Sequence, residues 1–297
     1  YREKAFKNAK AKGWIPENAQ LTPLHPRLAA WDSIPDEQQP FQSRLMEVLA
    51  GFAEHTDHPV GRIVSEIERL GYEENTLVVY IWGDNGSSGE GQDGTISELL
   101  AQNSVASEIE QHIEVLNELG GLDVLGSPLV DNMYHAGWAW AGSTPYQGMK
   151  LQASYLGGTR NPMMVKWPKG IKPDPKPRSQ FHHCNDLVPT IYELVGITPP
   201  KIVNGVEQDP IHGTSFAYAF NAPDAPDQLK TQFFDIMGSR SIYHNGWMAG
   251  AVGPRLPWVK GVDPDILTWS PDTDDWELYN IEEDWSQSKN VAAEYPE

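Results

Sequence analysis

Two side chains that could bind a metal ion stand together in the stretch YIWGDNGSSGEGQDGT, residues 80–95. Asp84 offers a carboxylate and Asn85 a carboxamide, and such hard oxygen donors suit Ca²⁺ or Mg²⁺. Gly83 and Gly86 flank the pair, so the backbone can turn tightly there and approach a ligand. The stretch lacks the alternating acids and the closing Glu of an EF-hand loop. Taken alone it is most often a turn, so a metal site would need further ligands from elsewhere.

A cation that could hold an anionic group lies downstream, in TPYQGMKLQASYLGGTRNPMMVKWP, residues 144–168. Lys150 precedes the pair Gly157–Gly158 and Arg160. An ammonium near a metal ion could hold one oxygen of a tetrahedral anion or steady a leaving group. Two alternatives stay open. Lys150 could be a surface lysine, and Arg160 could serve a structural ion pair as readily as a substrate.

Two short apolar runs predict the strands that would position these residues. The run 76–82, TLVVYIW, is unbroken, β-branched and aromatic, which is typical of a buried strand in a parallel sheet. It would deliver the GDNG turn to the carboxyl end of the sheet, where ligands gather in open α/β folds. The run 161–167, NPMMVKW, predicts a second buried strand.

Helices are predicted between and after these strands. Apolar residues recur at three- and four-residue spacing over 41–70 with Gly71 as the terminator, and further helices are predicted over 96–117 and 183–196. Past residue 230 the chain changes to short aromatic segments separated by turn residues, which predict an antiparallel sheet. The order of elements indicates an α/β main body with an appended β-rich subdomain.

Composition excludes several classes of partner. The 297 residues carry a formal net charge of −19, which argues against nucleic acid or an anionic membrane as a partner. No apolar stretch reaches membrane-spanning length, and one cysteine rules out an internal disulfide framework. The chain begins at Tyr1 and ends on NVAAEYPE, and we expect it to be an internal segment of a longer protein.

Other polar residues could do chemistry, but each has a plainer interpretation. His135 lies in an aromatic loop, and we treat a place in a substrate pocket and a structural role as equally open. For the remainder a solvated, capping or turn role is favoured over a metal or substrate site. These are His55 with Asp57 and His58, the adjacent His182 and His183, the pair Asp131–Asn132, and the acids Asp263, Asp265, Asp272, Asp274 and Asp275.

Four segments in order resemble the sulfatase family, and more narrowly the large bacterial arylsulfatases of the alkaline-phosphatase-like superfamily. They are GFAEHTDHPVGRIVSEIERLGYEENTLVVYIWGDNG, GWAWAGSTPYQGMKLQASYLGGTRNPMMVKWP, RSQFHHCNDLVPTIYELVGITPP and WELYNIEEDWSQSKNVAAEYP. The resemblance implies a partial alkaline-phosphatase-like sandwich, mostly a parallel sheet with flanking helices. Residues 1–229 would be the C-terminal part of the α/β domain, and residues 230–297 a small, truncated antiparallel subdomain.

The resemblance also implies roles for individual residues. Asp84 and Asn85 match the pair that helps to ligate the family's catalytic Ca²⁺, and Lys150 matches the lysine that contacts the substrate sulfate. The spacing from Lys150 to the glycine pair is one residue longer than in many sulfatases. The implied partner is a small-molecule sulfate ester. The compartment, bacterial periplasm or cytoplasm, stays open.

The chain departs from the family pattern in its nucleophile. Sulfatases use a formylglycine made from the Cys of a Cys-x-Pro-x-Arg motif, and no such motif occurs here. Cys184 precedes Asn185 and Asp186 inside a predicted helix, so we expect a buried structural thiol. We therefore expect a C-terminal segment that needs the missing N-terminal half for activity. The alternatives are a phosphodiesterase or phosphonate hydrolase of the same superfamily, or a non-catalytic binding module.

Overall fold

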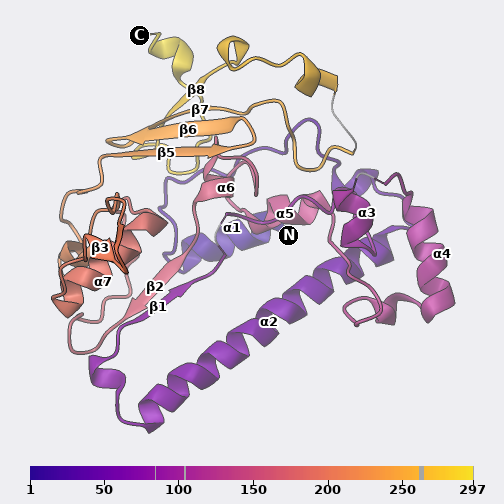
Figure 1. Ribbon diagram of the computed structural model, residues 1–297. Helices are drawn as coiled ribbons and strands as arrows, with labels where there is room; N and C mark the ends of the chain where they lie inside the picture. The colour runs from indigo at the N-terminus through magenta and orange to yellow at the C-terminus, as the bar shows by residue number, and fades with distance from the viewer. Residues whose placement is uncertain (84, 104, 261–263, 297) are drawn as a thin grey trace.

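The computed structural model describes residues 1–83, 85–103, 105–260 and 264–296 (Figure 1). Its helices are α1 (Arg2–Ala11), α2 (Gln39–Arg69), α3 (Glu98–Gln102), α4 (Ile109–Leu119), α5 (Ala136–Gly142), α6 (Leu156–Thr159) and α7 (Leu187–Val195). Its strands are β1 (Val78–Ile81), β2 (Met163–Lys166), β3 (Ile202–Val203), β4 (Val206–Glu207), β5 (Thr231–Ile236), β6 (Ser239–His244), β7 (Trp247–Ala251) and β8 (Glu277–Asn280). The protein is thus of mixed α/β composition.

The strands predicted over 76–82 and 161–167 both form, but their pairing differs from the prediction. β1 and β2 pair with each other in an antiparallel ladder, with Val78 opposite Lys166 and Ile81 opposite Met163. All strand ladders among the described residues are antiparallel, so the expected mostly parallel sheet is wrong for this part of the chain. The two strands are also only partly buried. An unbroken apolar run favours a strand, but it encodes neither the direction of the neighbouring strand nor what covers its faces.

The long helix α2 matches the predicted periodicity and runs along one side of the molecule (Figure 1). Gly71 follows its last turn with φ +72°, a conformation that glycine adopts without penalty. Near the start of the helix Phe41 and Leu45 are buried, and they pack against a cluster from the α4 region. The other members of that cluster are Ile96, Ile109, Leu116, Val124 and Leu125. Because Ile96 belongs to this cluster, the cluster attaches the segment after β1 to α2 and α4.

The helix predicted over residues 96–117 is divided in two. α3 ends at Gln102, and α4 begins at Ile109 after a capping box in which the Glu108 N–H donates to Gln111 Oε1 at 2.9 Å. Gly120 then ends α4 with φ +125°. The polar cap supplies a new helix start that the apolar periodicity alone did not reveal.

The antiparallel sheet predicted past residue 230 is present as β5–β6–β7–β8 in consecutive order. It lies at the opposite side of the molecule from α2 (Figure 1). Met248 of β7 is buried with Tyr146 and Leu156, so the sheet packs on the segment that carries Lys150. The division at residue 229 stays a prediction.

The helix predicted over 183–196 forms as a short 3₁₀ turn, Cys184–Asp186, followed by α7. Pro189 lies in the first turn of α7, and Gly196 ends it in the left-handed conformation, both as predicted. The expectation for Cys184 was wrong, because its side chain is exposed. The cysteine lies on the turn before the helix, where apolar periodicity does not determine which side chains are covered.

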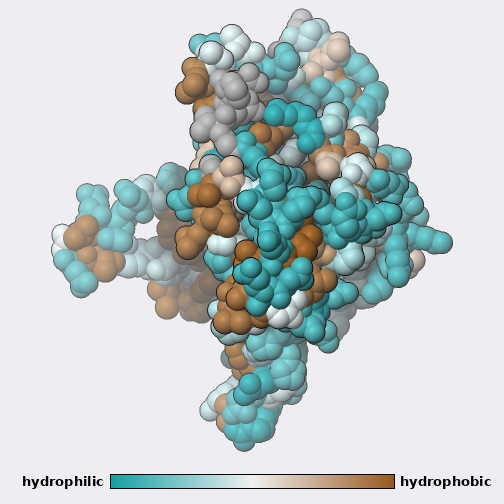
Figure 2. Space-filling model, turned by 90° about the vertical axis from the view of Figure 1, so that its right-hand side faces the viewer, coloured by the Kyte–Doolittle hydropathy of each residue, from teal (hydrophilic) through white to brown (hydrophobic). Residues whose placement is uncertain are grey.

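Apolar side chains also remain on the surface. Figure 2 shows brown apolar groups between teal polar ones on the face that includes α4. Around the β1–β2 pair, Ile81, Trp82 and Met164 are exposed, as is Phe52 on α2. Within the described residues, no helix combines the length and the apolar character needed to cross a bilayer.

Candidate functional site

The loop that follows β1 carries the predicted metal ligands. Asp84 lies outside the described residues, and Asn85 is exposed on this loop. The backbone turns at Gly83 and Gly86, with φ of +76° and +82°. Asn161, just before β2, accepts a hydrogen bond from the Gly86 N–H at 3.3 Å. The loop is therefore tied to the neighbouring strand immediately beside the predicted ligand pair.

Close packing explains the glycine at position 86. A Cβ placed on Gly86 would lie 2.1 Å from the carbonyl oxygen of Gly157, far inside contact distance. The glycine pair ahead of Arg160 thus lies directly against the loop after β1. The two segments singled out in the sequence meet in space, although some 60 to 75 residues separate them along the chain.

Lys150 is attached to the same loop through both its backbone and its side chain. Its N–H donates to the Ser87 carbonyl at 3.0 Å. Its ammonium lies 2.5 Å from Glu90 Oε2, and the two side chains are 32% and 20% exposed. A pair this close and partly shielded from water holds the ammonium at a defined position. Lys150 is therefore not a free surface lysine.

Glu90 was not singled out in the sequence, although it lies within the quoted loop. The stretch offered a visible acid six residues after Asp84, but nothing local indicated that its partner would be Lys150, 60 residues away. Ser88 Oγ donates to the same Glu90 oxygen at 3.0 Å. Loop 87–90 and Lys150 thus form one polar cluster.

His135 has a structural role in the described contacts. It is the N-cap of α5, where its Nδ1 accepts a hydrogen bond from the Gly137 N–H at 2.8 Å. Its Nε2 lies 4.0 Å from Asp93 Oδ1. Burial lowers the pKa of the imidazole, and the Asp93 carboxylate opposes that shift. The ring nitrogens are thus engaged with Gly137 and Asp93 rather than with Lys150.

Arg160 is held by aromatic rings. Its guanidinium lies 4.3 Å from the centroid of the Trp285 ring and 5.9 Å from that of Tyr146. This cation–π contact joins the segment after Lys150 to the C-terminal part of the chain. The arrangement favours the structural alternative for Arg160, with an aromatic partner in place of the expected acid.

Five of the remaining candidates have structural partners among the described residues. Asp57 accepts from the Tyr80 hydroxyl at 3.2 Å, Asn132 Oδ1 from the Gly126 N–H at 2.9 Å, and Asp274 pairs with Arg240 at 2.7 Å. His183 Nδ1 accepts from the Asn185 N–H, and His182 packs against Phe216. Asp263 and the side chain of Asp265 lie outside the described part of the chain.

A calcium ion cannot be assigned to the described residues alone. Among them, no three or more His, Cys, Asp or Glu side chains come together as metal ligands would. Asn85 supplies one amide oxygen, and Glu90, the nearest acid along the described loop, is paired with Lys150. Because Ca²⁺ takes six to eight oxygens, these residues could at most form one side of its shell.

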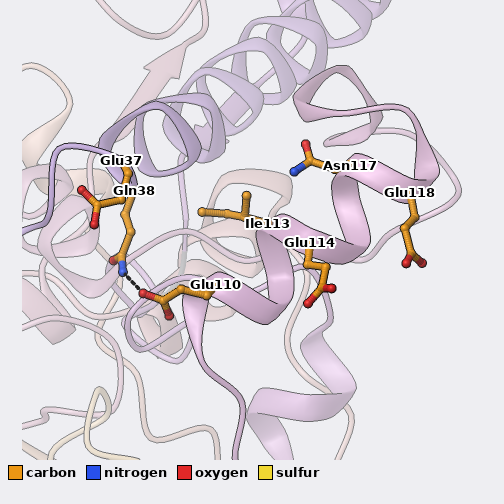
Figure 3. Close-up of a pocket in the computed structure, with 7 residues that line it drawn as sticks. All are labelled: Glu37, Gln38, Glu110, Ile113, Glu114, Asn117 and Glu118. Atoms are coloured by element: carbon orange, nitrogen blue, oxygen red, sulfur yellow. Dashed lines mark hydrogen bonds between the residues drawn. The ribbon is translucent and has the colours of Figure 1, made fainter.

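The molecule also has an open groove of about 580 Å³ between the start of α2 and α4 (Figure 3). Gln38 and Glu110 face each other across it, with Gln38 Nε2 donating to Glu110 Oε1 at 2.8 Å. The other lining residues are Glu37, Ile113, Glu114, Asn117 and Glu118. Four carboxylates would repel an anionic substrate, and none of the predicted site residues that the structure describes, Asn85, His135 and Lys150, lines this groove.

Comparison with known proteins links these features to one family. A family model described as "Sulfatase" matches residues 4–197. An uncharacterized sulfatase of Schizosaccharomyces pombe is 26% identical over 302 residues, which cover 100% of this chain and 49% of that protein. An arylsulfatase of Klebsiella aerogenes is 25% identical over 187 residues, which cover 63% of this chain and 37% of that protein. The chain therefore spans about half the length of the first relative and less of the second.

One solved structure supports the fold. It comes from Bacteroides thetaiotaomicron and was described with the metabolism of multiple glycosaminoglycans. It superposes with a TM-score of 0.52 at 18% sequence identity, covering 81% of this chain and 40% of that one. At this level of identity the similarity concerns the fold alone.

Proposed function

This chain belongs to the sulfatase family, which its match over residues 4–197 shows, and we propose that it forms part of an arylsulfatase-like enzyme that hydrolyses sulfate esters. The observation that carries the proposal is the contact of Lys150 with the loop after β1. It attaches Lys150 to Ser87 and Glu90, on the loop that also carries Asn85, in a protein whose net charge of −19 would otherwise repel a sulfate ester.

Lys150 would bind the sulfate group. A sulfate monoester is a tetrahedral anion, and an ammonium can donate hydrogen bonds to its oxygens as the charge shifts during cleavage of the ester. The position of Lys150 suits this task, because its backbone N–H on Ser87 and its ion pair with Glu90 orient the side chain before substrate arrives. A small-molecule sulfate ester is the proposed substrate class.

Asp84 and Asn85 would supply two ligands of a Ca²⁺ site. When bound, the ion would offset the negative charge of the sulfate. The other ligands, like the nucleophile, would come from sequence outside these 297 residues, since no Cys-x-Pro-x-Arg motif for a formylglycine occurs among them. We accordingly expect these residues by themselves to be inactive.

The test uses the longer protein that carries this chain, with 4-nitrophenyl sulfate as substrate. Lys150→Ala should lower kcat/KM by roughly 10²-fold, the usual cost of removing one donor to a developing anion. The matched control is Lys166→Ala, which removes an exposed lysine paired with Glu68 and should leave activity within about twofold. Equal activity of Lys150→Ala and the parent protein would overturn the role of Lys150.

The same assay separates the alternatives. Faster hydrolysis of bis-4-nitrophenyl phosphate than of the sulfate would favour a phosphodiesterase. Failure to hydrolyse either compound, by a folded and full-length protein, would favour a non-catalytic binding module.

A further inference from the structure

We propose that Glu90 is a positioning residue that aims the ammonium of Lys150 at the sulfate group, a proposal that rests on the function proposed above. The sulfatase-like segments in the sequence assign no role to Glu90. Its place in the structure does, because its carboxylate is held between Lys150 and Ser88.

Hydrogen bonds on the same loop fix the Glu90 carboxylate. Oε2 accepts from Ser88 Oγ at 3.0 Å and lies 2.5 Å from Lys150 Nζ. The Glu90 backbone N–H also approaches Ser88 Oγ, at 3.3 Å. A carboxylate with two donors on one oxygen has little freedom to swing toward solvent, so the direction of the ammonium is fixed with it.

The loop is itself anchored in the protein. The Ser88 N–H donates to the Tyr134 hydroxyl at 3.1 Å, and Tyr134 packs against two of the buried apolar clusters. Gly89 lies against Met149, since a Cβ at that glycine would be 2.3 Å from the Met149 sulfur. Met149, which precedes Lys150, thus packs against Gly89, which precedes Glu90. This contact keeps the backbone segments that carry the ammonium and the carboxylate together.

The pair is partly open rather than sealed. Within the described residues Glu90 is the acceptor for the Lys150 ammonium. An ammonium has three N–H donors, so this one acceptor among the described residues does not exhaust them. Lys166–Glu68 provides the contrast, because both of those side chains are about half exposed, 50% and 46%, and belong to the surface.

A double-mutant cycle tests whether Glu90 acts through Lys150. In the full-length protein, Glu90→Ala should lower kcat/KM by roughly 10- to 100-fold, the effect expected for losing a hydrogen bond to a charged group. Glu90→Gln should retain more activity than Glu90→Ala, because its amide oxygen can still accept from the ammonium. In a Lys150→Ala background, Glu90→Ala should cost no further activity. Equal losses in both backgrounds would overturn the proposal, because they would show a structural effect independent of Lys150.

A second measurement keeps the two proposals distinguishable. Amine labelling with acetic anhydride, followed by mass spectrometry of the Lys150 peptide, needs no activity. Lys150 should be labelled several-fold faster in Glu90→Gln than in the parent, while Lys166 should react equally in both. A parent protein that hydrolyses no sulfate ester would overturn the proposed function. Unchanged labelling of Lys150 in an active protein would overturn only the role of Glu90.

Discussion

Replacing Gly86 by alanine tests the contact that brings the two halves of the candidate site together. Gly86 has φ +82°, and its Cα faces the carbonyl oxygen of Gly157 so closely that a Cβ would lie 2.1 Å from it. Both partners at this contact are backbone, which cannot move aside as the end of a flexible side chain can. The loop after β1 would have to shift away from the segment that carries Lys150.

Two terms set the size of the effect. A side chain in the left-handed region costs about 1–2 kcal/mol, and overpacking against fixed atoms costs about 1–3 kcal/mol. Gly86→Ala should therefore lower the free energy of unfolding by about 2–5 kcal/mol. Gly71→Ala is the matched control, because Gly71 has φ +72° but a Cβ added there would meet no atom within 4 Å. Gly71→Ala should therefore lower the free energy of unfolding only by the conformational cost of about 1–2 kcal/mol.

Urea unfolding followed by tryptophan fluorescence measures the difference. We expect the transition midpoint to fall in both variants and to fall further in Gly86→Ala. In the full-length protein, Gly86→Ala should also reduce hydrolysis of 4-nitrophenyl sulfate, whereas Gly71→Ala should not. If Gly86→Ala were no less stable than Gly71→Ala, the loop would not pack on Gly157 and the site geometry described above would be wrong.

Three further outcomes follow from single residues. Arg2→Ala should destabilise the chain by about 2–4 kcal/mol, because the buried guanidinium donates hydrogen bonds to the Trp140, Pro145 and Tyr146 carbonyls. Thermal unfolding would measure this loss, with substitution of the exposed Lys4 by alanine as the control. Burial holds the pKa of His135 in the folded protein below its usual 6.5. As the pH falls below about 6.5, the unfolded state therefore binds the proton before the folded state does, and the folded protein loses stability. His135→Asn, which keeps a capping side chain, should reduce that loss when urea midpoints at pH 7.5 and about 5.5 are compared. Cys184 is exposed, so Ellman's reagent should titrate one thiol per chain before any denaturant is added, and a thiol that reacts only after unfolding would contradict the structure.

Local elements and the family could be predicted from the sequence. The apolar repeat of α2, its end at Gly71 and the turn-rich strands past residue 230 are properties of short segments, and they folded as predicted. The sulfatase resemblance rested on four local segments, and the family match over residues 4–197 confirms it. Such features depend on neighbours along the chain, so a single sequence carries enough information to read them.

Contacts between distant residues were decided only by the tertiary structure. The direction of β2 along β1, the partner of Lys150 and the aromatic support of Arg160 from Trp285 each join residues 60 to 125 positions apart. No periodicity or spacing encodes such a pairing, because it depends on how the chain returns after many intervening turns. The sequence could name Lys150 as a cation for an anionic group, but only the packing of Gly86 on Gly157 and of Glu90 against Lys150 shows how that cation is held in place.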